Sequence, residues 1–351
     1  MMDRKENFMH FINHEPHDHI PCTADFCMVG GNMELFENGP LGGGADEFGC
    51  IWDATDSAMG QGVPAPGQKY ISDVTDWKNQ VHFPDPSKYD WQAQADAQMP
   101  AYNPETQVLD YGCWNGQFLR LMHLLGFDNG LLALAMEPEA CSEFMGAITD
   151  YRISTLPYIK KYFNPDIVTI YDDVATTANL FMSPNTYREL IAPHHKKWFA
   201  AVREQGMIPS MHICGKCESI IPDLPGEGTE MWEICEITND LVGLQKKVGD
   251  KLAFFGGYPM NGKFSYTDPT EEELRQSVRD TIDKYGPAGN YGFFGLIMYA
   301  DPQRTFNTMM TLTDEAIKYG TNYYVDGPGS AASTVESVKV SNIWQESGVS
   351  K

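Results

Sequence analysis

The sequence predicts an α/β protein whose strands form a parallel sheet, and three observations support this fold class. Of the 351 residues, 42% are apolar, which is enough for one large core or two smaller ones. From about residue 107 onward, short apolar runs alternate with stretches of helical length, as is typical of a parallel sheet. The sequence contains neither a P-loop nor the glycine fingerprint of a dinucleotide-binding fold.

The first hundred residues are less regular than the rest. A short helix is expected over 3–15, followed by a strand over 20–27. The stretch that follows is rich in Gly, Pro, Asp and Trp, which predicts a small subdomain with a short strand near 46–52. We therefore divide the chain into an N-terminal segment, 1–105, and a remainder, 106–351, which carries the active site within the same structural unit.

The remainder alternates strands and helices along the chain. Helix starts are marked by Pro138, by Ser183-Pro184 and by the capping-box pattern of Thr270 and Glu273. The expected strands cover 108–111, 166–173, 207–214, 230–235, 251–257 and 291–297, and the expected helices cover 117–136, 138–162, 183–205, 239–248, 270–285 and 302–319. We count about seven strands when the N-terminal segment is included, and the pattern alone leaves the sheet open or closed.

Charge and composition exclude several classes of function. The formal net charge is −23, from 48 acidic and 25 basic residues, and such a field repels nucleic acid and anionic membrane surfaces. No run of about 18 apolar residues occurs, so no membrane span is expected. The charged N-terminus has no signal-peptide apolar region, which predicts a cytoplasmic protein. In that compartment the eight cysteines are expected to be thiols or metal ligands.

The strongest candidate for a metal site is the pair His212 and Cys214. They end an apolar strand, where side chains two residues apart share one face, and Gly215 then lets the backbone turn away. An imidazole and a thiolate side by side suit Zn²⁺. A buried thiol beside a hydrogen-bonded histidine is the alternative.

Two ligands do not complete a zinc site, and several residues qualify as the third. Cys235 ends the next strand and is the first candidate, with Cys217 in the nearer turn as the alternative. A carboxylate such as Glu236 or Asp172 is also chemically acceptable to zinc.

Further polar groups follow other strands, where functional groups of parallel α/β proteins gather. Asp172 and Asp173 are candidate catalytic residues together with His212, because the acidic pair can bind a cation, ligate a metal or transfer a proton. Adjacent residues of a strand point to opposite faces, so one of the two carboxylates is expected to be structural, as a helix cap. The candidate substrate-binding residues are Tyr111, Trp114, Glu236, Asn239, Gly257 and Tyr258. Core packing and ordinary turns are the alternative roles for the aromatic residues and for Gly257.

Several blocks of the chain resemble the uroporphyrinogen decarboxylase superfamily. These blocks read RKENFMHFINHEPHDHIP, DEFGCIWD, PDIVTIYDDVATTANLFMSPNTYRELIAPHHKK, MIPSMHICGK and NDLVGLQKKVGDKLAFFGGYP. Within the superfamily, the chain is similar to the cobalamin-dependent methyltransferase branch, which includes O-demethylase components. The resemblance covers nearly the whole chain and implies a (β/α)8 TIM barrel with an N-terminal extension and with its active site at the C-terminal mouth.

Two features separate the branches of this superfamily. True decarboxylases carry an Arg-Gln-Ala-Gly-Arg-Tyr block after the first strand, whose arginines meet the carboxylates of the substrate, but the matching region 24–31 contains no arginine. The methyltransferase branch holds zinc through His-x-Cys and a distant cysteine near the last barrel strand. His212 and Cys214 match the first two ligands, whereas the late strand, 291–297, has no cysteine.

The resemblance implies a corrinoid-dependent methyltransferase. It would move a methyl group from a small O-methyl donor, such as a methoxylated aromatic, to the cob(I)alamin of a separate corrinoid protein. Zn²⁺ held by His212 and Cys214 would act as a Lewis acid on the ether oxygen. Transfer from a methyl-corrinoid to a thiol, decarboxylation of a porphyrinogen-like substrate and a non-catalytic binding barrel stay open as alternatives, and a homodimer is one open arrangement of the chain.

Overall fold

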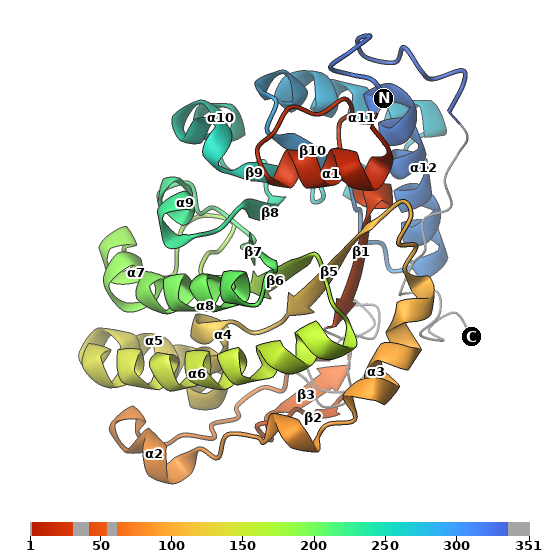
Figure 1. Ribbon diagram of the computed structural model, residues 1–351. Helices are drawn as coiled ribbons and strands as arrows, with labels where there is room; N and C mark the ends of the chain where they lie inside the picture. The colour runs from red at the N-terminus through yellow and green to blue at the C-terminus, as the bar shows by residue number, and fades with distance from the viewer. Residues whose placement is uncertain (1, 31–41, 55–61, 336–351) are drawn as a thin grey trace.

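A seven-stranded parallel sheet forms the centre of the protein. The structure is a computed structural model and describes residues 2–30, 42–54 and 62–335. Within these residues the strand order is β1-β5-β6-β7-β8-β9-β10 (Figure 1). The strands are β1 (Phe26–Gly30), β5 (Val108–Cys113), β6 (Ile167–Tyr171), β7 (Ile208–His212), β8 (Met231–Cys235), β9 (Ala253–Gly257) and β10 (Tyr291–Phe294). The α/β fold class expected from the sequence is confirmed, and the sheet curls as in a TIM barrel.

The two edges of the sheet meet through the segment that precedes β1. The Phe293 amide of β10 donates to the Pro21 carbonyl at 2.7 Å, and Cys22 forms a parallel bridge with Phe293. A 3-10 turn, Thr23–Asp25, then separates this bridge from β1, because the Asp25 carboxylate accepts from the Cys22 amide at 2.8 Å. The expected strand over 20–27 is therefore a bridge, a turn and the start of β1. The described part of the sheet has seven strands, not eight.

Helices surround this sheet on its outer side (Figure 1). The longer ones are α4 (Gln117–Leu125), α5 (Phe127–Met136), α6 (Pro138–Tyr162), α7 (Pro184–Leu190), α8 (Ala192–Glu204), α10 (Leu241–Val248), α11 (Glu271–Tyr285) and α12 (Pro302–Gly320). Two further helices, α2 (Trp77–Gln80) and α9 (Leu224–Glu227), have a single turn each. Helix α3 (Trp91–Gln98) belongs to the N-terminal segment. The stretch expected to be one helix over 117–136 breaks at Gly126, whose φ of +79° ends α4. Among the described residues no single helix is long and apolar enough to cross a membrane, although the bent pair α4–α5 passes that test by length and composition.

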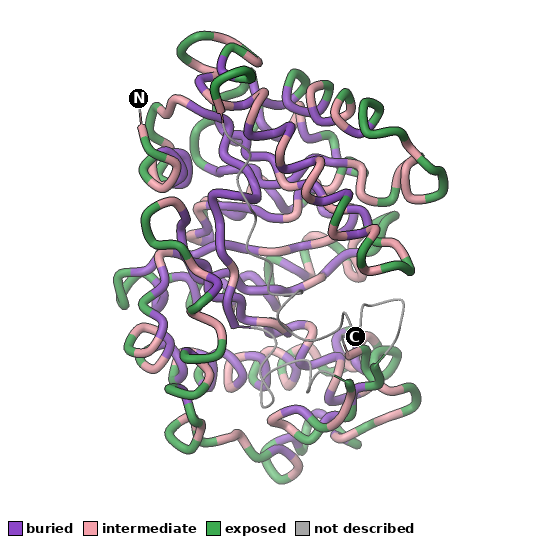
Figure 2. The backbone as a smooth tube through the Cα atoms, turned by 90° about the vertical axis from the view of Figure 1, so that its right-hand side faces the viewer, coloured by how far each residue is buried: buried purple, intermediate pink, exposed green. Residues whose placement is uncertain are grey.

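Helix α1 (Arg4–Ile12) closes the end of the barrel at which the strands begin. Its Phe8 and Phe11 side chains are almost fully buried, and the Phe8 ring lies 6.2 Å from that of Phe26 and 5.6 Å from that of Phe255. Figure 2 shows buried backbone at the centre of the molecule, with exposed segments around it. Because α1 fills this end of the barrel interior with apolar side chains, the reaction site is expected near the opposite ends of the strands.

A small antiparallel sheet makes up part of the N-terminal segment. It consists of β2 (Gly44–Ala45), β3 (Ile51–Ala54) and β4 (Gly62–Pro64). The Asp46 carboxylate accepts from the Trp52 indole at 3.0 Å and from the buried Arg120 guanidinium of α4 at 2.5 Å. Arg120 is fully buried, so this ion pair ties the small sheet to the helices of the barrel.

One histidine of α4 makes the stability of the fold sensitive to acid. His123 packs edge-on against Trp52, with 4.9 Å between ring centroids, and burial lowers its pKa to about 3, helped by the charge of Arg120. An unfolded histidine titrates near pH ~6.5, so between these values the unfolded chain binds a proton that the folded chain does not. His123 is therefore expected to lower the free energy of unfolding by about 1.4 kcal/mol for each unit by which the pH falls within that window.

Urea unfolding between pH 7 and pH 4 measures this effect. In the His123→Phe variant, the slope of the free energy of unfolding against pH should decrease by the contribution of about one proton. The control is His82→Gln, at an exposed histidine, which should keep the slope of the parent protein. Equal slopes for parent and His123→Phe would contradict the assignment.

Candidate metal centre

His212 lies at the last position of β7 and points into the barrel between two in-register neighbours. Across the sheet, Tyr171 of β6 pairs with His212, and His212 pairs with Glu233 of β8. In-register side chains of adjacent parallel strands lie on the same face about 5 Å apart. The Tyr171 ring stacks on the imidazole at 4.3 Å, and Glu233 Oε1 lies 3.4 Å from His212 Nδ1.

Cys214 and Asp173 complete a three-residue group around the other ring nitrogen. His212 Nε2 lies 3.2 Å from Cys214 Sγ, and the Asp173 carboxylate accepts from the Cys214 amide at 2.7 Å. One ligand atom from each of the three residues lies within 4.8 Å of the others. Nitrogen, sulfur and oxygen donors at such spacings fit Zn²⁺, whose ligands sit about 2.0–2.3 Å from the ion. Three protein ligands leave a fourth position for substrate, as in catalytic zinc sites.

Without a metal ion, the pair His212 and Cys214 holds its protons tightly, because the pKa of each is raised. Burial acts to lower the pKa of His212, but the adjacent Cys214, Glu233 and Asp173 outweigh it, so the pKa is raised well above its usual value. Burial raises the pKa of the Cys214 thiol, and His212 only partly offsets this. A metal ion binding here therefore displaces a proton from the histidine–cysteine pair.

Asp172, expected among the catalytic residues, has a structural position. Its carboxylate is fully buried and accepts from the Phe118 and Leu119 amides at 3.0 and 2.8 Å, which caps the start of α4. It also lies 2.8 Å from His195 Nε2. Gly116 precedes α4 and has no capping side chain, and a Cβ there would come within 2.4 Å of Asp172. The two adjacent carboxylates therefore point in different directions: Asp172 caps α4, and Asp173 lies beside His212 and Cys214.

The structure does not bring the two expected third cysteines to this group. The fully buried Cys217 thiol lies 3.7 Å from the Gly215 carbonyl. Cys235 follows an irregularity in the pairing of β8 with β9, and its thiol lies 3.1 Å from the Trp232 carbonyl. Both thiols are turned toward backbone of their own segments, and the third ligand atom near His212 belongs to Asp173 instead.

The profile of the family described as "Uroporphyrinogen decarboxylase (URO-D)" matches residues 111–295, which is more than half of the chain. The chain belongs to the uroporphyrinogen decarboxylase family. The match runs from β5 to β10 and so includes every residue of the candidate metal centre. The membership expected from the sequence blocks is confirmed.

One sequence relative and one solved structure of similar fold are methyltransferases by name. A methylcobamide:CoM methyltransferase, MtaA, from Methanosarcina barkeri is 31% identical over 124 residues, which cover 35% of this chain and 35% of that protein. The match thus spans about a third of the length of the curated relative. A solved methyltransferase from Methanosarcina mazei superposes with a TM-score of 0.62 over 90% of this chain and 99% of that chain, at 14% identity. At this identity the superposition establishes the fold alone.

In this family member, two residues expected to bind substrate point into the helical layer. The Tyr111 ring packs edge-on against Phe163 at 5.0 Å, and the Tyr258 hydroxyl bonds to Ser277 of α11 at 2.9 Å. Both are nearly fully buried, so we correct their assignment to core packing. Gly257 has a φ of +74°, and a Cβ there would lie 3.1 Å from the Tyr285 ring, so this glycine permits close approach of α11.

Glu236 and Asn239 hold the turn that follows Cys214. Glu236 accepts from the Gly215 amide at 3.0 Å, and Asn239 donates to the Gly215 carbonyl and accepts from the Cys217 amide, both at 2.8 Å. Gly215 has a φ of +85°, and a Cβ there would lie 2.5 Å from the Thr176 carbonyl oxygen. These contacts fix the path of the backbone that presents Cys214, and the substrate-binding role expected for Glu236 and Asn239 stays a prediction.

Trp114 remains a candidate for substrate contact. Its ring stacks on Tyr171 at 4.4 Å and is nearly parallel to it. The indole Nε1 is buried, and no described residue accepts a hydrogen bond from it. Trp114 is only partly buried, so the candidate contact with a substrate is its ring and not this enclosed N–H.

Sequence reasoning missed Tyr171 and Glu233, which flank His212. Tyr171 lies in the run TIYDD and Glu233 lies in the run MWEIC, and both runs read as ordinary apolar strands. The one available signal was Glu233 itself, because a carboxylate inside an apolar strand requires a buried partner.

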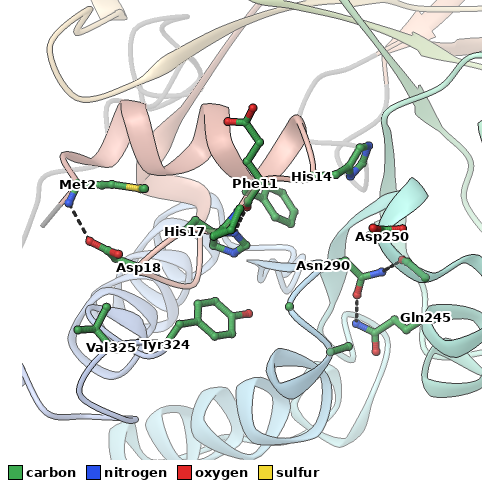
Figure 3. Close-up of a pocket in the computed structure, with 15 residues that line it drawn as sticks. Met2, Phe11, His14, His17, Asp18, Gln245, Asp250, Asn290, Tyr324 and Val325 are labelled. Atoms are coloured by element: carbon green, nitrogen blue, oxygen red, sulfur yellow. Dashed lines mark hydrogen bonds between the residues drawn. The ribbon is translucent and has the colours of Figure 1, made fainter.

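A cavity of about 680 Å³ lies at the other end of the barrel. It is lined by residues that follow α1 and by residues that precede β9 and β10, among them His14, His17, Asp250 and Asn290 (Figure 3). His14 binds Glu230, the residue before β8, at 2.9 Å. Because this end carries the strand starts, where TIM barrels place stabilising contacts, we assign no catalytic role to this cavity.

Proposed function

We propose that this chain is a corrinoid-dependent methyltransferase. It moves a methyl group from a small O-methyl donor, such as a methoxylated aromatic, to the cob(I)alamin of a separate corrinoid protein. The observation that carries the proposal is the N, S and O donor group of Asp173, His212 and Cys214 at the C-terminal ends of the strands. The name of the Methanosarcina barkeri relative supports a methylated corrinoid as the reaction partner.

The donor set favours an oxygen leaving group. Asp173, His212 and Cys214 would hold Zn²⁺ and leave one position open. When bound, the ion supplies a Lewis acid to the ether oxygen and so weakens its bond to the methyl carbon. A carboxylate is a harder ligand than a thiolate and donates less electron density. Asp173 in place of a second cysteine therefore favours activation of an ether oxygen over activation of a thiol.

The residues around the group would position an aromatic donor. Trp114 is partly exposed and places an aromatic ring next to Tyr171 and His212. Contact with this ring would hold the methyl carbon in line between the ether oxygen and the corrinoid, which lowers the entropic barrier. As the methyl carbon accepts the electron pair of cob(I)alamin, its bond to oxygen breaks and that electron pair stays on the oxygen.

Apolar residues at the same end of the barrel suit contact with a partner protein. Ile237 follows β8 and Met298 follows β10, and their side chains are 47% and 44% exposed. These two side chains leave apolar surface beside the strand ends, where we propose that the protein carrying the corrinoid docks.

Methyl transfer from a methyl-corrinoid to a thiol is the second candidate. The name of the Methanosarcina barkeri relative describes this direction, with CoM as acceptor. Decarboxylation of a porphyrinogen is less well supported, because region 24–31 lacks arginine and a net charge of −23 opposes a polyanionic substrate.

Spectroscopy of the corrinoid distinguishes the two directions. With zinc-loaded enzyme, cob(I)alamin on its carrier protein is expected to convert to methylcobalamin when methoxylated aromatics are added. The second candidate predicts instead the loss of methylcobalamin on addition of thiols. The Cys214→Ser protein is the matched control and should give neither change. A zinc-loaded enzyme that converts neither corrinoid form with any donor or thiol would exclude both candidates.

A further inference from the structure

Three side chains on adjacent strands form a continuous set inside the barrel. Tyr171, His212 and Glu233 are paired in register on β6, β7 and β8. All three point toward the barrel interior because they occupy equivalent positions of neighbouring strands. Glu233 is 5% exposed, so its carboxylate depends on protein partners for its hydrogen bonds.

The contacts of Glu233 account for the orientation of the imidazole. Its Oε1 atom accepts from the Tyr171 hydroxyl at 2.9 Å and lies 3.4 Å from His212 Nδ1. The Tyr171 ring stacks on the imidazole at 4.3 Å with 23° between the planes, which restricts rotation of the ring. With Nδ1 directed at Glu233, Nε2 is left facing Cys214 at 3.2 Å.

We propose that Glu233 is a positioning residue of the metal centre, and that Tyr171 holds it in place. Glu233 accepts the Nδ1 proton of His212 and so selects the tautomer whose unprotonated Nε2 faces Cys214 and Asp173. This inference rests on the proposed metal centre and adds the group that orients one of its ligands. Metal-bound histidines generally donate their other N–H to a carboxylate or a carbonyl, which fixes the ring and raises its basicity.

Another buried carboxylate provides a matched comparison. Asp110 of β5 is fully buried in the same interior and accepts from the Thr169 hydroxyl at 2.9 Å. No described hydrogen bond joins it to His212, although the charge of His212 acts to lower its pKa. Burial raises the pKa of Asp110 well above its usual value, and the charge of Glu233 adds to this, so asparagine closely mimics its neutral form. Asp110→Asn therefore alters the polar interior but leaves the contacts of His212 intact.

Zinc affinity measured by chelator competition tests the inference without requiring turnover. Glu233→Ala is expected to weaken zinc binding by about 10- to 100-fold, which is the usual effect of losing such a partner. Glu233→Gln should lose less, because its amide oxygen can still accept from Nδ1. Tyr171→Phe should also lose less, since the stacked ring remains. Asp110→Asn should stay within about twofold of the parent.

The spectrum of the Co²⁺-substituted protein reports the geometry of the ligands. Glu233→Ala and Glu233→Gln are expected to change the visible bands of Co²⁺, whereas Asp110→Asn should reproduce the parent spectrum. Thermal melting of each metal-free variant checks folding, and Glu233→Gln carries the test if Glu233→Ala does not fold.

The possible outcomes separate this inference from the proposed function. If the parent binds zinc and the Glu233 variants bind it equally well with unchanged Co²⁺ spectra, the positioning role is overturned and the metal centre stands. An Asp110→Asn loss as large as that of Glu233→Ala would also overturn it, because the effect would then be a general one of interior charge. A parent protein that binds no zinc would overturn the metal centre and this inference together.

Discussion

Cys214→Ser is expected to abolish stable zinc binding and to lower the rate of methyl transfer by about 10³-fold or more. Cys214 supplies the single sulfur of the Asp173, His212 and Cys214 group. A serine hydroxyl at this position is a far weaker zinc ligand than a thiolate. Loss of the Lewis acid removes several kcal/mol of transition-state stabilisation, and about 1.4 kcal/mol corresponds to a tenfold change in rate. Zinc content after dialysis and the rate of methylcobalamin formation measure the two effects.

Substitutions at the other cysteines provide the control for this prediction. Cys217→Ser and Cys235→Ser should keep the zinc content of the parent, because both thiols face backbone carbonyls away from His212. Asp173→Ala should lose zinc as Cys214→Ser does. If Cys235→Ser removes the metal while Asp173→Ala retains it, the donor set is two cysteines and a histidine, and our assignment of Asp173 fails.

The order and type of elements followed from local sequence signals. The Thr270–Glu273 capping box begins α11 with both reciprocal hydrogen bonds, and Pro138 opens α6 at the predicted residue. Breaks inside long helical stretches were missed. Gly126 ends α4 through its positive φ, and α8 begins anew at Ala192 with Pro193 in its first turn. Such breaks depend on how each helix packs on the sheet, which local propensity does not encode.

The candidate site was predictable where its geometry is local in sequence. His212 and Cys214 lie two residues apart, and the period of an extended chain brings them together. Glu233 reaches His212 only through the register between β7 and β8, across 21 residues of sequence. The choice of Asp173 over Cys235 depends on the pairing irregularity between Glu233 and Cys235. A register or a bulge is a property of the assembled sheet, so neither could be obtained from spacing.

Asp172→Ala is expected to destabilise the protein by about 3–5 kcal/mol while leaving the metal ligands in place. The substitution leaves the Phe118 and Leu119 amides and His195 Nε2 without their buried acceptor. Each buried donor without a partner costs about 1–3 kcal/mol, so the loss of the acceptor shared by three such donors costs at least about 3 kcal/mol. Urea unfolding of the metal-free protein measures the loss.

The neighbouring carboxylate provides the contrast that makes this prediction specific. Asp173 is partly exposed and accepts from one described amide, that of Cys214, so Asp173→Ala should cost metal-free stability less than half as much as Asp172→Ala. Zinc affinity should change in the opposite order, with a large loss for Asp173→Ala and a small one for folded Asp172→Ala. Two adjacent aspartates directly after β6 would then act on opposite sides of the chain, one capping α4 and the other binding the metal. If Asp172→Ala unfolds at the urea concentration of the parent and loses its zinc, the two assignments must be exchanged.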